Sequence, residues 1–324
     1  MGRLNFSAGC MEKVTLNNIS KSYNKGRVTA VKDISFSVHS GEIFGLIGPD
    51  GAGKTTLFRI LTTLLKADAG SATVDGLDVL KDYRKIRTRV GYMPGRFSLY
   101  LDLTVEENLN FFATVFNTTI TENYHLIKDI YQQIEPFKNR RAKALSGGMK
   151  QKLALSCALI HKPVVLFLDE PTTGVDPVSR KEFWEMLKNL KNQGITILVS
   201  TPYMDEANLC DRITLISEGN ILSIDSPTNM ISKFGKILWS VKGQKMHRML
   251  TDLRTNPHIA TCFAFGDSLH LTLSDQEYTI ESLTKFLREK GYEEAKIDLT
   301  KPSIEDCFMN LGINPSIPEH HESN

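Results

Sequence analysis

The residues best suited to chemistry stand together in one glycine-rich stretch, which reads GPDGAGKTT and fits the pattern G-x-x-x-x-G-K-[ST]. Glycines in such a loop let backbone N–H groups surround a polyphosphate, and the helix that follows directs its positive end at the anion. Lys54 is expected to reach the β- and γ-phosphates, and the Thr55 hydroxyl to bind Mg²⁺. The predicted nucleotide-binding residues are therefore Gly48, Pro49, Asp50, Gly51, Ala52, Gly53, Lys54, Thr55 and Thr56.

Two buried strands must position these groups. The apolar run 42–47 predicts a strand that enters the loop, and 57–61 predicts the helix that leaves it. A second strand is predicted over 164–168, where the apolar residues stand between two prolines. It ends in Asp169 and Glu170; beside a phosphate loop, the first could hold Mg²⁺ and the second could polarise the attacking water. The simpler alternative is that both carboxylates only end the strand.

The order of strands and helices predicts two domains. Residues 12–230 alternate buried strands with helices, which is typical of a doubly wound α/β domain, and helical patterns dominate over about 84–158. Residues 231–312 follow the order βαββαβ, which predicts a small ferredoxin-like α+β appendage. Residues 1–11 and 313–324 are predicted to be a disordered leader and a disordered tail. The strands expected in the large domain lie at 13–23, 32–38, 42–47, 70–77, 164–168, 195–200 and 213–216.

Composition and charge argue against several classes of protein. The net charge of +2 on 324 residues gives no electrostatic argument for a nucleic-acid partner. The five cysteines are scattered and form no C-x-x-C pair, which suggests a reducing compartment and no cysteine metal site. No apolar run approaches the roughly 18 residues of a membrane span. Any membrane part of the system is therefore expected on another chain.

Three further motifs, in a fixed order, resemble those of ABC transporter ATPases. The stretch LSGGMKQ, from Leu145 to Gln151, resembles the family's signature motif, and EPTTGVDP, from Glu170 to Pro177, resembles its Walker B exit and D-loop. Tyr23 falls where the family has an aromatic residue that stacks on adenine. The resemblance covers residues 13 to about 230. It implies a P-loop NTPase fold of the ABC type, with a parallel core sheet, an antiparallel β subdomain and a helical subdomain.

The resemblance also implies a site shared between two chains. In this family two ATPase domains sandwich two ATP molecules, each between the phosphate loop of one domain and the signature motif of the other. It therefore adds Ser146, Gly147, Gly148 and Asp176 to the nucleotide-binding residues, and it implies ATP and Mg²⁺ as cofactors. Glu170 is the implied catalytic residue, and Thr55 and Asp169 are the implied metal ligands.

Four other stretches are similar to the ATPases of drug and antibiotic exporters, in which the ATPase and the permease are separate chains. They lie at 91–94, 103–109, 203–207 and 302–308. The implied function is ATP binding and hydrolysis that powers a separate integral-membrane permease. The implied assembly is a homo- or heterodimer of ATPases, peripheral on the cytoplasmic face of the cell membrane, without nucleic acid. The permease would supply most of the substrate selectivity.

Two positions depart from the family pattern. Gly95 stands where the family usually has glutamine, and Pro202 stands where it usually has histidine. Neither side chain can donate a hydrogen bond, so hydrolysis is expected to be slow but measurable. The two departures suggest one alternative, an ATP-binding partner with weak hydrolysis, and a second alternative is a soluble regulatory ATPase of the ABC type without a membrane partner.

Overall fold

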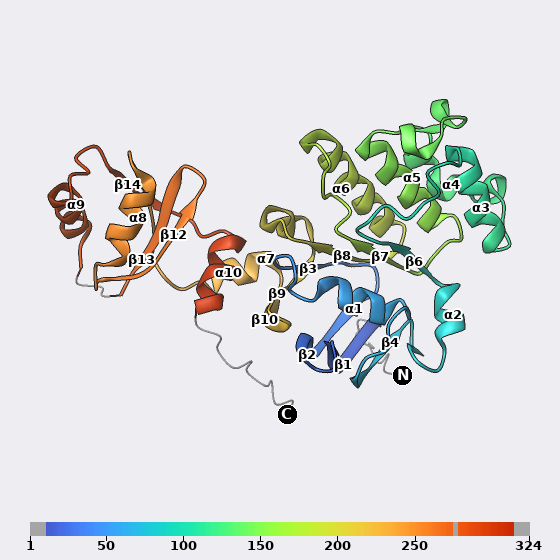
Figure 1. Cartoon of the computed structure of the whole chain (residues 1–324), viewed down its shortest axis with the longest axis horizontal. Coiled ribbons are helices and arrows are strands. Elements are labelled where there is room, and N and C mark those ends of the chain that lie inside the picture. The colour runs from blue at the N-terminus through green and yellow to red at the C-terminus, as the bar shows by residue number, and fades with distance from the viewer. Residues whose placement is uncertain (1–10, 275–277, 314–324) are drawn as a thin grey trace, which may run out of the picture. The chain divides into compact units, whose positions relative to one another are not determined.

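The computed structural model describes residues 11–274 and 278–313, and the chain divides into two compact units between Ser226 and Pro227 (Figure 1). The division falls four residues before the expected boundary at 230. The predicted leader and tail lie outside the described residues, apart from Met11 and Ile313. In the described part of the chain, no helix combines the length and hydropathy that crossing a bilayer requires.

A six-stranded sheet in the order β10-β9-β3-β8-β7-β6 forms the centre of the first unit (Figure 1). Its strands are β3 (Ile43–Ile47), β6 (Val90–Met93), β7 (Val165–Asp169), β8 (Thr196–Thr201), β9 (Arg212–Ser217) and β10 (Asn220–Asp225). All neighbours are parallel except β9 and β10. Every residue of β3, β7 and β8 is buried, as expected for parallel strands covered on both faces. The predicted parallel core sheet is confirmed, and the carboxyl ends of these three strands meet at one edge.

A second, antiparallel sheet has the order β2-β1-β4-β5. Its strands are β1 (Glu12–Tyr23), β2 (Val28–His39), β4 (Ala69–Val74) and β5 (Leu77–Asp78). Buried side chains of this sheet join those of the core sheet and of helix α1 (Lys54–Leu61) in one apolar cluster. Within it the rings of Phe36 and Phe44 stack with centroids 5.2 Å apart. The sequence predicts this antiparallel subdomain, and the structure confirms it.

The helical part of the first unit begins later than expected. Its helices are α3 (Val105–Val115), α4 (Ile120–Tyr131) and α5 (Gly147–Leu159), and both α3 and α4 start with a capping box. The sequence predicts that the helical segment begins at about residue 84. That region contains the short helix α2 (Tyr83–Arg87) and then strand β6, which pairs with β7 in the core sheet. The strand escaped prediction because four residues ended by Pro94 are too short to show a period. Helix α6 (Pro177–Asn192) follows β7.

The second unit is a four-stranded antiparallel sheet with helices. Its elements are α7 (Pro227–Ser232), β11 (Leu238–Lys242), α8 (Met246–Arg254), β12 (Ile259–Phe265), β13 (Ser268–Leu273), α9 (Ile280–Glu289), β14 (Lys296–Thr300) and α10 (Ile304–Ile313). The sheet order is β12-β13-β11-β14, the order of a ferredoxin-like fold. The predicted α+β appendage is confirmed. Asp306 of α10 accepts a hydrogen bond from His270 of β13 at 2.8 Å, which fixes the closing helix to the sheet.

His161 joins the helical part of the first unit to the edge of the core sheet. Its ring stacks on Phe116 with centroids 3.8 Å apart, and its Nε2 lies 3.0 Å from the Val90 carbonyl oxygen. A carbonyl can only accept, so Nε2 carries the proton and Nδ1 does not. That Nδ1 is buried without a hydrogen-bond partner among the described residues. Burial lowers the pKa of His161 below the usual 6.5, which outweighs the hydrogen bond to Val90.

The folded state should therefore lose stability in mild acid. As pH falls through 6.5, the unfolded chain takes up the His161 proton first, because the folded pKa is the lower one. The stability that the lowered pKa of His161 affects is fully present above pH 6.5. Below that pH, the free energy of unfolding falls by at most about 1.4 kcal/mol per pH unit from this group. Thermal unfolding from pH 8 to pH 5 should show a flatter acid limb for His161→Phe than for the parent. The exposed His125→Gln should retain the parent slope; equal slopes for the parent and His161→Phe would contradict this account.

Candidate functional site

The glycine-rich loop connects β3 to α1. Its backbone conformation or its close contacts with neighbouring backbone disfavour other residues at its glycines. Gly51 and Gly53 have φ of 81° and 104°, in the region that favours glycine. A Cβ on Gly53 would lie 2.5 Å from the Ala30 carbonyl oxygen, and one on Gly48 would lie 2.1 Å from that of Ile216. No side-chain hydrogen bond caps the start of α1, so its first N–H groups are left for a ligand anion.

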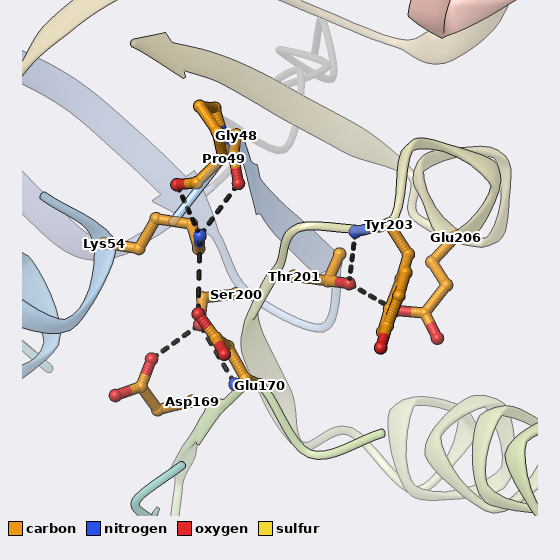
Figure 2. A network of polar contacts seen from close by, with 9 residues as sticks. All are labelled: Gly48, Pro49, Lys54, Asp169, Glu170, Ser200, Thr201, Tyr203 and Glu206. Carbon is orange, nitrogen blue, oxygen red and sulfur yellow. Dashed lines mark hydrogen bonds and ion pairs between the residues drawn. The ribbon is translucent and has the colours of Figure 1, made fainter. Parts of the chain in front are cut away.

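Lys54 is buried beneath this loop. Its ammonium donates to the carbonyl oxygens of Gly48 and Pro49 at 2.8 and 3.0 Å, and it lies 3.4 Å from Glu170 Oε1 (Figure 2). A buried charge is stable only when it is paired and hydrogen-bonded, and these three oxygens meet that need. Phosphate oxygens would make stronger, charge-assisted bonds at the same ammonium.

The rest of the loop divides into exposed and buried positions. Pro49 and Asp50 are exposed, Ala52 and Thr56 are buried, and Thr55 is half-buried at the start of α1. Tyr23, at the end of β1, is half-buried, and its hydroxyl lies 3.3 Å from Thr56 Oγ1. The loop and the predicted adenine-stacking residue therefore lie side by side.

Glu170 reaches Lys54 from the end of β7, where the sequence predicts the two carboxylates, and Ser200 of β8 holds both Asp169 and Glu170 (Figure 2). The Ser200 hydroxyl donates to Asp169 Oδ1 at 2.6 Å. The Glu170 N–H donates to the hydroxyl and the carbonyl oxygen of Ser200, both at 3.1 Å. Glu170 has a φ of 50°, uncommon for a non-glycine residue and the kind of strain that surrounding structure must enforce.

Sequence reasoning missed Ser200 and its neighbour Thr201 as site residues. The Thr201 carbonyl oxygen accepts from the N–H of Gly48 at 3.3 Å, so the end of β8 contacts the first residue of the phosphate loop. Its hydroxyl donates to Glu206 at 2.5 Å and accepts from the Tyr203 N–H at 3.1 Å (Figure 2). The available signal was weak: two polar residues that end a strand whose centre, residues 197–199, is apolar.

The two unusual positions both adjoin this site. A Cβ on Gly95 would lie 3.1 Å from the Asp169 carbonyl oxygen and 3.7 Å from Glu170 Cβ, so a side chain there would stand beside the carboxylates. Pro202 directly follows Thr201 and is half-buried.

The signature and D-loop residues form a second cluster. Ser146 caps α5 by accepting from the Met149 N–H at 3.3 Å. A Cβ on Gly147 would lie 3.5 Å from the Gly174 carbonyl oxygen, and one on Gly148 would lie 2.9 Å from Ser179 Oγ.

Asp176 caps α6 within this second cluster. Its carboxylate accepts from the N–H groups of Val178 and Ser179 at 3.1 and 3.0 Å, and the bonds from Ser179 are the main cause that lowers the pKa of Asp176. Ser146, Gly147 and Asp176 are exposed. Within residues 11–274 and 278–313, no hydrogen bond or ion pair joins this cluster to residues 48–56.

Comparison with known proteins places this geometry in one family. The family model described as ABC transporter matches residues 31–173. The probable multidrug ABC transporter ATP-binding protein YbhF of Escherichia coli K12 is 39% identical over 302 residues, which are 92% of this chain and 52% of that protein. The chain therefore spans about half the length of YbhF.

Two shorter relatives match almost end to end. The linearmycin resistance ATP-binding protein LnrL of Bacillus subtilis is 33% identical over 91% of this chain and 96% of its own length. The doxorubicin resistance ATP-binding protein DrrA of Mycobacterium tuberculosis is 31% identical, over 94% of each chain.

Solved structures agree with these relatives. The cbiO1 protein of Clostridium perfringens, described as part of an ABC transporter complex, has a TM-score of 0.62 and 26% identity over 68% of this chain and 91% of its own. The dimeric MJ0796 cassette bound to ADP and phosphate has a TM-score of 0.60 and 26% identity over 66% of this chain and 98% of its own. The motifs, the fold and relatives above 30% identity agree: the chain belongs to the family of ABC transporter ATP-binding proteins.

Proposed function

We propose that this chain is the ATP-binding and ATP-hydrolysing subunit of an ABC exporter. The observation that carries the proposal is the Lys54 ammonium beneath the glycine loop, 3.4 Å from Glu170, with Ser200 joining Glu170 and the neighbouring Asp169. The relatives' names support the exporter, since YbhF is called a probable multidrug transporter protein and DrrA and LnrL are called resistance proteins. These names do not favour the alternative of a soluble regulatory ATPase.

The geometry divides the chemistry among the chain's own residues. The uncapped start of α1 and the Lys54 ammonium bind the phosphates, and Lys54 exchanges the Gly48 and Pro49 carbonyls for phosphate oxygens. Glu170, held at its backbone by Ser200, polarises the attacking water. Tyr23 stacks on the adenine. Thr55 and Asp169 would hold Mg²⁺, which usually takes only one or two carboxylates together with substrate phosphates and supplies neutralising charge there.

Substituting Lys54 tests both binding and hydrolysis. Lys54→Ala should abolish calorimetric ATP binding and turnover, because the phosphates lose their main cation, whereas the exposed Lys66→Ala should bind ATP like the parent. Light scattering of the parent with ATP should show a dimer that Lys54→Ala does not form. Unchanged nucleotide affinity in Lys54→Ala would refute the proposed function.

The exposed signature cluster supports a dimeric site. Ser146 and Gly147 face solvent and have no bond to their own phosphate loop within the described residues. Their place at the start of α5 suits a phosphate brought by a second ATPase chain. The related MJ0796 cassette is described as dimeric, which supports the same assembly here, with Asp176 beside the shared nucleotide.

An apolar groove in the first unit supports docking of a membrane permease. It has a volume of about 330 Å³ and is lined by residues of β6, the segment after it, α3 and α5, among them Phe97, Phe112 and Phe116. Tyr100 and Leu101 are half-exposed nearby, and the Tyr100 ring packs on Phe111 with centroids 4.9 Å apart. Exposed aromatic side chains in such a patch mark interaction sites, and the proposed occupant is a cytoplasmic helix of the permease. This docking would hold the chain at the cytoplasmic face of the membrane.

A charge at the rim of the groove tests the docking. Tyr100→Asp should reduce co-purification with the co-expressed permease by about tenfold or more, the loss expected for an aromatic anchor. Its melting temperature should stay near that of the parent, because the side chain is 50% exposed. Phe137→Asp should co-purify normally, because Phe137 is an exposed aromatic that neither lines the groove nor follows a lining residue, whereas Tyr100 follows the lining residue Leu99. Full retention of Tyr100→Asp would argue against this surface.

The presence of Gly95 and Pro202 in place of the family's glutamine and histidine argues for slow hydrolysis. Restoring the two family residues measures how much these positions limit the rate. Gly95→Gln combined with Pro202→His should raise turnover by at least about tenfold, since positioning contacts are worth this much or more. ATP affinity should stay the same. The neighbours of position 95 must move by a few tenths of an ångström, because a Cβ there lies 3.1 Å from the Asp169 carbonyl oxygen. Unchanged turnover with intact binding would mean that the two departures do not limit the rate.

A further inference from the structure

A buried polar network surrounds Pro202 at the end of β8. Glu206, in the short 3-10 helix η3 (Met204–Leu209), is 1% exposed, and its Oε2 accepts from the Thr201 hydroxyl at 2.5 Å (Figure 2). The same hydroxyl accepts from the Tyr203 N–H at 3.1 Å, so Thr201 and Tyr203 are tied together across the proline. The other carboxylate oxygen, Oε1, is buried and has no hydrogen-bond partner among the described residues.

Arg180 of α6 is the cation that faces this carboxylate. Its Nε lies 3.6 Å from Glu206 Oε1, and its Nη1 lies 3.8 Å from Asp205 Oδ2. The guanidinium carbon stands 4.3 Å from the centre of the Tyr203 ring, and three quarters of the Arg180 side chain is buried. A buried carboxylate without its cation is strongly destabilising, so the place of Glu206 depends on Arg180.

This network connects two parts of the proposed site. At one end, Thr201 accepts from Gly48 of the phosphate loop, and the preceding Ser200 holds Asp169 and Glu170. At the other end, Arg180 stands one helical turn after Asp176, and the backbone N–H of Arg180 donates to the Asp176 carbonyl oxygen at 2.9 Å. The proline at 202 offers no donor of its own.

We propose that Arg180 is a positioning residue for ATP hydrolysis. It fixes Glu206, Glu206 fixes the segment 201–203, and that segment fixes the end of β8 from which Ser200 holds Asp169 and Glu170. The proposal rests on the function given above and adds to it a residue whose side chain contacts Asp205, Glu206 and Tyr203. Among the described residues, no hydrogen bond or ion pair joins Arg180 to residues 48–56, so the loss of its side chain is expected to change turnover and to leave ATP affinity unchanged.

Truncation of the charge is the first arm of the test, performed on the full chain. Arg180→Met should lower kcat by about tenfold or more, the usual cost of losing an outer partner of a catalytic group. The calorimetric Kd for ATP and the KM should change by less than about twofold, because no binding contact is lost. The exposed neighbour on the same helix, Lys181→Met, should turn over like the parent. The kcat of the parent protein tests the proposed function. The ratio of kcat between Arg180→Met and the parent tests the role of Arg180.

Removal of the stranded charge is the second arm. Glu206→Gln added to Arg180→Met should recover at least about half of the lost kcat on a logarithmic scale, because the buried charge is gone while an amide oxygen still accepts from Thr201. Because Glu206→Gln would also relieve a loss of folding caused by the stranded charge, kcat is expressed per mole of folded protein, and the melting temperatures of all variants are measured alongside. Parental turnover in Arg180→Met, an equal loss of ATP affinity, or no recovery in the double variant would each overturn the proposal. A parent without ATPase activity would instead overturn the proposed function.

Discussion

The first unit depends on keeping the Lys54 ammonium buried and paired beneath a glycine loop. A charge in that place needs oxygen atoms on every side, and the fold supplies them from the Gly48 and Pro49 carbonyls and from Glu170. The loop can pass over the ammonium only because Gly48 and Gly53 approach neighbouring backbone more closely than any Cβ allows. The parallel sheet meets this demand by ending β3 and β7 at the same edge.

Strand β8 lies between β3 and β7 and is the common support of the site. Ser200 holds the Asp169 carboxylate and the Glu170 backbone, and Thr201 holds the phosphate loop through Gly48 and the following segment through Glu206. One strand end therefore sets the distances between groups that come from separate parts of the sequence. The Glu170 backbone at a φ of 50° is the local strain that this support maintains.

Sequence alone predicted the elements whose signals are local. The glycine pattern identified the loop, the apolar run before Asp169 identified β7, and the βαββαβ order identified the second unit. It failed where the signal was short or depended on contacts: β6 has four residues, and Ser200 looked like the polar end of a buried strand. Its pairing with Asp169 is set by the register of β7 against β8, which no local pattern contains.

Gly95 belongs to two surfaces at once, because it lines the apolar groove and also adjoins the Asp169 and Glu170 backbone. Because Gly95 has no side chain, its main chain is the part of the groove wall that faces the Asp169 carbonyl oxygen. A displacement of the segment after β6 would therefore bring main chain, with no intervening side chain, against the strand end that carries the two carboxylates. A glutamine at position 95 would instead place a flexible side chain between the groove and the Asp169 backbone.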